Sequence, residues 1–93
     1  MVSAMAEIDV RVSPHDERYV ARVTVRDRTV TRHVVRISAE ELDRYGGGDV
    51  VDLVRRSFEF LLAREANTSI LPEFSLSTIE RYFPEYAEAF RKG

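Results

Sequence analysis

The chain has 93 residues, a formal net charge of −2 and no cysteine. A domain of this length buries only about two-thirds of the surface that its unfolded chain exposes, which excludes a deep cleft between two lobes. The lack of cysteine excludes disulfides and thiolate metal sites. A net charge near zero excludes attraction of the whole molecule to nucleic acid or anionic lipid. We expect one domain over residues 1–93, in which residues 1–6 are disordered.

The start of the chain has no signal-peptide pattern, because a basic region followed by a long apolar region is missing from MVSAMAEIDV. No apolar run approaches the roughly 18 residues that a membrane span needs. The sequence therefore predicts a cytoplasmic protein that does not enter a membrane.

Residues 7–38 alternate between apolar and charged side chains, and this period of two predicts strands at 7–13, 18–26 and 30–38. Strands joined by short loops usually pair antiparallel. The expected fold class is therefore α+β: a three-stranded antiparallel meander packed on one main helix, with short helices before and after it.

Parity determines the register of the second hairpin. Val25 and Val35 share a face only if the loop between their strands holds an odd number of residues, which predicts a three-residue loop at 27–29. Val23 then lies opposite His33, and Arg26 lies opposite Val30. One face of the sheet becomes apolar, with Ile8, Val10, Val12, Tyr19, Ala21, Val23, Val25, Val35 and Ile37.

The other face carries six arginines, which are Arg11, Arg18, Arg22, Arg26, Arg32 and Arg36. Arginines on a sheet can follow a phosphate backbone, but this face lacks the aromatic rings that stack on single-stranded bases. A solvated or partner-covered face crossed by salt bridges is the simpler interpretation. Residues 1–38 carry seven arginines and five acidic residues, a net charge of +2, whereas residues 39–93 carry seven basic and eleven acidic residues, a net charge of −4. This polarity suits self-association or a protein partner as well as a nucleic acid.

The hydrophobic period changes to about 3.6 at Ser38, so residues 39–66 are expected to be helical. SAEEL is typical of a capping box, in which Ser38 is the N-cap and Glu41 reaches back to it. A short helix over 39–45 should end at the glycine triplet 46–48, since glycine tolerates positive φ. The triplet resembles a phosphate-binding loop only superficially, and we interpret it as a hinge.

The main helix is predicted over 50–66, with Asp49 as its N-cap and Asn67 as its C-cap. Its apolar stripe should pack on the apolar sheet face. The residues expected to be almost inaccessible to solvent are Phe58, Leu61, Val54, Val23, Val35 and Ile37.

The tail, residues 67–93, is unusually apolar and aromatic for a terminus. Ser75 or Ser77 can begin a short helix, and another is allowed from Pro84 to about residue 90. The large apolar side chains of the tail must be buried either against this chain or against a partner. For an interface between two copies, the expected anchors are Tyr82, Phe83 and Tyr86.

The segments SFEFLLAREANTSILPEF and SLSTIERYFPEY resemble the C-terminal part of short bacterial proteins that are usually described only as uncharacterised. The resemblance covers the last 35 to 40 residues and lies in their pattern. It implies an existing bacterial family, of cytoplasmic location, and brings no activity or catalytic residue with it.

Candidate catalytic residues are few. His33 shares the apolar face and is expected to be packed, whereas His15 lies beside Asp16 and Glu17 in a turn that we interpret as solvated rather than metal-binding. We predict no catalytic, cofactor-binding or metal-binding residue. The expected function is a non-catalytic protein–protein interaction module of a bacterial cytoplasm, acting as a homodimer. The alternative is a small nucleic-acid-binding or regulatory protein that uses the arginine-bearing face, and an enzyme is the third possibility.

Overall fold

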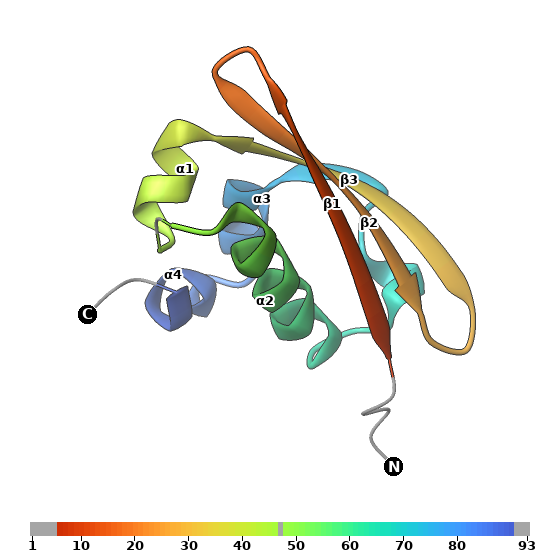
Figure 1. Cartoon of the computed structure of the whole chain (residues 1–93). Helices are drawn as coiled ribbons and strands as arrows, with labels where there is room; N and C mark the ends of the chain where they lie inside the picture. Colours follow the sequence, from red (N-terminus) through yellow and green to blue (C-terminus); the bar gives the residue numbers. More distant parts are fainter. Residues whose placement is uncertain (1–5, 47, 91–93) are drawn as a thin grey trace.

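The computed structural model describes residues 6–46 and 48–90, which form a four-stranded sheet with helices on one side (Figure 1). The expected disorder of residues 1–6 falls outside the described residues, apart from Ala6. The elements in chain order are β1 (Glu7–His15), β2 (Arg18–Arg26), β3 (Val30–Ser38), α1 (Ala39–Arg44), α2 (Val50–Leu62), the 3-10 helix η1 (Asn67–Ser69), β4 (Glu73–Ser75), α3 (Leu76–Tyr82) and α4 (Glu85–Phe90).

The three long strands form the predicted antiparallel meander. The loop between β2 and β3 has three residues, and Val23 pairs with His33 as parity requires. The first turn is shorter than the sequence suggests, because β1 continues to His15 and only Asp16 and Glu17 connect it to β2. Asp16 adopts a φ of 59°, a conformation that aspartate tolerates better than most residues.

The prediction of a sheet of only three strands is wrong. The tail returns along the free edge of β3, where β4 pairs with it in parallel. The Val34 N–H donates to the Pro72 carbonyl at 2.8 Å and begins this pairing. A three-residue strand is too short to show an alternating pattern in the sequence, so only the long-range contact identifies it.

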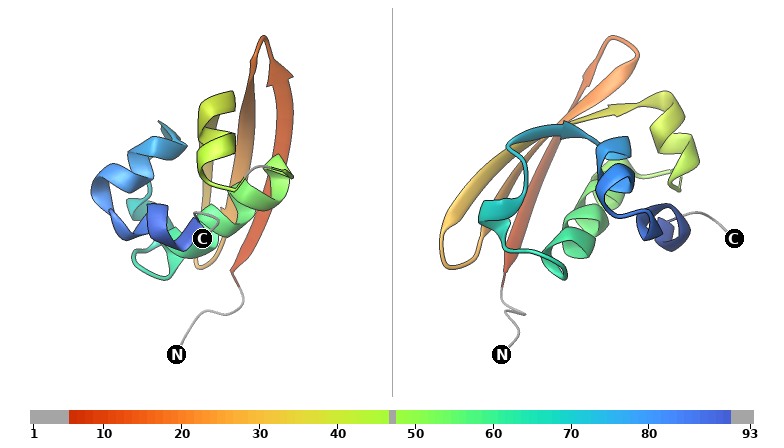
Figure 2. Two further views of the ribbon diagram at one scale, coloured as in Figure 1. Left: turned by 90° about the vertical axis from the view of Figure 1, so that its left-hand side faces the viewer. Right: turned by 180° about the vertical axis from the view of Figure 1, so that it is seen from behind.

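The core lies between the apolar sheet face and the helices, and the six residues predicted for it are at most 4% exposed. Tail side chains complete it, so the tail packs against its own chain (Figure 2). Buried tail residues include Ile70, Phe74, Leu76, Ile79, Tyr86 and Phe90. No helix of residues 6–46 and 48–90 is long and apolar enough to span a membrane.

The predicted starts of α1 and α2 are confirmed. Ser38 and Glu41 form the capping box of α1, and the Asp49 carboxylate accepts from the Val51 N–H at 3.0 Å. Gly46 and Gly48 have φ values of 146° and 87°, as a helix end at glycine predicts, while Gly47 lies outside the described residues.

Two predictions about helix ends are wrong. The helix α2 ends at Leu62 with Ala63 as its C-cap, although the residues up to 66 are good helix formers. Asn67 is buried against the sheet, where its amide serves other acceptors. Of the two possible starts of α3, Ser75 is the N-cap, but its side chain makes no capping hydrogen bond. Glu41 replaces that bond, because its second oxygen accepts from the Ser77 N–H at 2.9 Å.

Candidate interaction surfaces

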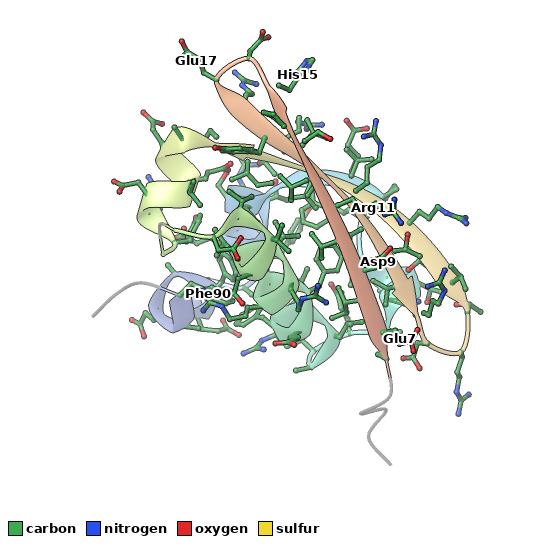
Figure 3. All side chains as sticks on the ribbon, viewed as in Figure 1. Glu7, Asp9, Arg11, His15, Glu17 and Phe90 are labelled. Carbon is green, nitrogen blue, oxygen red and sulfur yellow. The ribbon has the colours of Figure 1, made fainter. Side chains whose placement is uncertain are left out.

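The sheet face opposite the helices is open and carries all six arginines of the predicted set, each of them exposed. They occupy alternate positions of β1, β2 and β3, as the period of two requires. Figure 3 shows Glu7, Asp9 and Arg11 of β1 on the side of the strand that points away from the helices. We call this surface the arginine face.

Charges on the arginine face are only partly compensated. Arg36 forms an ion pair with Glu73, and Arg11 lies 3.7 Å from Asp9. Arg11 also pairs directly with Arg22 across the strands, and like charges in this position repel each other. Within the described residues, the other four arginines of the face form no ion pair; these are Arg18, Arg22, Arg26 and Arg32.

A second candidate surface is an open apolar pocket of about 270 Å³ near β4, at the edge of the sheet opposite to β1. It lies between the end of α2, the segment from η1 to β4, and α3. We call it the tail pocket. It is lined by Leu61, Glu65, Ser69, Ile70, Leu71, Phe74, Thr78, Ile79, Tyr82 and Phe83.

Two of the three anchors predicted for a partner lie in this pocket. Tyr82 is 67% exposed and Phe83 is partly buried, whereas Tyr86 is completely buried and offers no surface to a partner. Leu71 is 43% exposed and borders the same pocket, but it is not among the predicted anchors. The sequence signal that could have identified Leu71 is its position directly before Pro72, because a residue before proline favours an extended conformation.

His33 holds the edge of the tail pocket in place. Its ring is 3% exposed and tilts against Phe58 at 5.3 Å, which confirms the prediction of a packed histidine. Its Nδ1 donates to the Leu71 carbonyl at 2.7 Å, so in the neutral ring Nε2 accepts from the Thr31 hydroxyl at 2.9 Å. Both ring nitrogens thus serve the structure.

Two buried phenols join the helices. Ser57 uses its only proton on the Leu53 carbonyl, so Tyr86 donates to the Ser57 hydroxyl at 2.7 Å. Tyr45 donates to Glu80 at 2.5 Å. Burial raises the pKa of Tyr45 to about 12, with the Glu80 hydrogen bond as the next contribution, and burial raises the pKa of Tyr86 above its ordinary value as well. Both hydroxyls therefore keep their protons at neutral pH.

His15 ends β1 at the tip of the first hairpin, near Glu17 (Figure 3). Its side chain is exposed, but His15 belongs to the strand and pairs with Arg18, so its prediction as a turn residue is wrong. In the part of the chain that the structure describes, no three histidine or carboxylate side chains are grouped as metal ligands.

The fold and its surfaces define a small α+β protein with a mixed four-stranded sheet. No family model, curated protein or solved structure matches the chain.

Proposed function

We propose that the chain is a non-catalytic protein–protein interaction module of a bacterial cytoplasm, acts as a homodimer, and receives an apolar side chain of a protein partner in the tail pocket. The observation that carries this proposal is the position of Leu71 and Tyr82. Both are large, apolar and exposed, and both border one concave apolar pocket. Isolated exposed apolar side chains are ordinary, but a cluster around a pocket is typical of a binding site.

The pocket is built on rigid elements. The His33 ring holds the Leu71 carbonyl, and the Val34 N–H holds the next carbonyl along the chain, that of Pro72. An edge fixed in this way loses little conformational entropy when a ligand binds. Among the described residues that line the pocket, Glu65 is the only charged one, so we expect a partner segment whose apolar anchor is flanked by lysine or arginine.

Selection of a random peptide library on the immobilised protein tests the proposal. We expect enriched peptides to share an apolar residue beside a basic one, and to bind the Leu71→Ser and Tyr82→Ala variants at least tenfold more weakly. The matched control is Val30→Ser, which removes an apolar side chain of similar exposure, 51%, outside the pocket. Peptides that bind all variants equally, or a selection without enrichment, would contradict the proposal.

The second candidate function is nucleic-acid binding by the arginine face. The facing pair Arg11 and Arg22 favours it, since a polyanion would relieve the repulsion between the two side chains. Fluorescence anisotropy with mixed-sequence oligonucleotides should then show binding that falls steeply with salt. Arg22→Ala and Arg26→Ala should weaken it, whereas Arg81→Ala, on α3, should not. Binding that is absent at low salt excludes this function.

A further inference from the structure

The strand β1 lies at one edge of the sheet: β2 pairs with it on one side, and within residues 6–46 and 48–90 no strand lies on its other side (Figure 2). It is nine residues long. An edge strand of this length offers a row of backbone donors and acceptors to another strand.

The direction of these backbone groups follows from one hydrogen bond at the far side of the sheet. The Val34 N–H donates to the Pro72 carbonyl, so the N–H and C=O groups of the even-numbered residues of β3 point toward β4. Those of its odd-numbered residues point toward β2. In the register of the second hairpin, the odd-numbered residues of β2 bond to β3, so its even-numbered residues bond to β1. These pair with odd-numbered residues of β1, so the N–H and C=O groups of the even-numbered residues of β1 point away from the sheet. Two further features agree. The Ile8 carbonyl accepts from Arg55 at 2.5 Å, and Pro14, which has no N–H, occupies an outward position where β2 requires no donor.

We propose that two copies of the chain pair through β1 in antiparallel orientation, with Val10 opposite the partner's Val10 and Ile8 opposite the partner's Val12. This proposal rests on the homodimer of the proposed function and states which surface forms it. All residues in these pairs direct their N–H and C=O groups outward, so each pair can exchange two hydrogen bonds. Arg55 occupies one of the two lone pairs of the Ile8 carbonyl and leaves the other for the partner.

Charge complementarity selects this register. It places Asp9 opposite the partner's Arg11, and Arg11 opposite the partner's Asp9, on the arginine face. A register shifted by two residues would centre the dimer on two facing aspartates or on two facing arginines, and like charges directly opposite each other are unfavourable. The register with Val10 at the two-fold axis therefore combines the full set of outward residues with two attractive pairs.

The apolar side of β1 has room for a partner. Ile8, Val10 and Val12 are only partly buried, whereas their neighbours Val25 and Val23 on β2 are at most 1% exposed. Pairing of two copies would bring these aliphatic side chains together at the axis and shield them from water. The tail pocket stays free, because β4 forms the opposite edge of the sheet.

Charge reversal tests the register. We expect Asp9→Arg and Arg11→Asp each to weaken the dimer about tenfold or more in sedimentation equilibrium, since each variant places like charges opposite each other. An equimolar mixture of the two variants should form a heterodimer, and the double variant D9R/R11D should regain the wild-type dimer. Glu88→Arg, an exposed reversal on α4, is the matched control and should leave the dimer unchanged.

Backbone probes test the edge itself. Val10→Pro removes an outward N–H and spares the bonds to β2, so it should abolish the dimer while the protein stays folded by circular dichroism. Amide exchange of Ile8, Val10 and Val12 should slow as wild-type concentration rises. A wild-type monomer up to millimolar concentration, or a dimer indifferent to these variants, would overturn the proposal. Because the Asp9→Arg variant keeps the tail pocket, peptide binding by that variant separates failure of the dimer from failure of the pocket.

Discussion

Tyr45 closes α1 with its ring fully buried against Tyr86, at 4.9 Å between ring centres, and its hydroxyl bonded to Glu80. Burial, followed by that hydrogen bond, raises the pKa of the phenol from 10.0 to about 12. The unfolded chain releases this proton near pH 10, whereas the folded chain keeps it to about pH 12. The stability linked to Tyr45 is therefore complete below pH 10 and is lost as pH rises through 12.

The first prediction concerns this residue. Tyr45→Phe should lower the free energy of unfolding at pH 7, by about 1.5–3 kcal/mol for a hydrogen bond to a charged group. It should also make the decline between pH 10 and 11 shallower than in the wild type. Urea unfolding at each pH measures both effects. Tyr82→Phe, a change at an exposed ring, should follow the wild-type curve, and parallel curves for wild type and Tyr45→Phe would refute the argument.

At the scale of elements, the segment from η1 to Leu71 is tied to the edge of β3 by side-chain bonds. The Asn67 amide donates to the Thr29 carbonyl at 3.0 Å and to the Thr31 hydroxyl at 3.1 Å. His33 adds the bond to the Leu71 carbonyl. These residues lie 36 to 38 positions apart in the chain, so the bonds hold the tail in position for β4 to pair.

The second prediction is that Asn67→Asp destabilises the protein by about 1–3 kcal/mol, because the new side chain keeps the size of asparagine but cannot donate to either acceptor. Amide exchange at Val34, which donates to Pro72, should accelerate with it. Ser69→Ala, an exposed change in the same 3-10 helix, is the control. Unchanged stability together with unchanged Val34 exchange would show that the segment is held by packing alone.

At the scale of the whole molecule, Phe58 joins the sheet, the main helix and the tail. Its ring is completely buried and lies 5.3 Å from the His33 ring and 6.0 Å from the Phe74 ring. These three rings come from α2, β3 and β4. A cavity at this position would therefore remove contacts from all three parts of the fold.

The third prediction is that Phe58→Ala lowers the free energy of unfolding by about 3–5 kcal/mol. This is a large fraction of the 5–15 kcal/mol typical of folded domains, so chemical denaturation should show a clearly lower midpoint. The neighbouring exposed change Glu59→Ala should have little effect. If Phe58→Ala melts within a degree or two of the wild type, the helix face assigned to the core is wrong.

The candidate sites were only partly visible in the sequence. The arginine face follows from strand parity, and its exposure is confirmed. Tyr82, Phe83 and Tyr86 have similar sequence contexts, yet Tyr86 turns into the core and only the first two line the tail pocket. Leu71 joins them because His33 holds its carbonyl from 38 residues away. No local pattern distinguishes a buried tyrosine from an exposed one in helices as short as α3 and α4.

Local sequence patterns predicted the three long strands, the register of the second hairpin, the two faces of the sheet and the starts of α1 and α2, whereas the length of the first turn was not predicted. These features depend on side-chain periods of 2 and 3.6 and on caps, which act between residues close in the chain. Long-range contacts account for the parallel β4, the early end of α2 at Leu62, the hydrogen bonds of Asn67 to the sheet and the packing of the tail on its own core. Each of these depends on contacts between segments distant in sequence, whose energies outweigh local preference once the chain is folded.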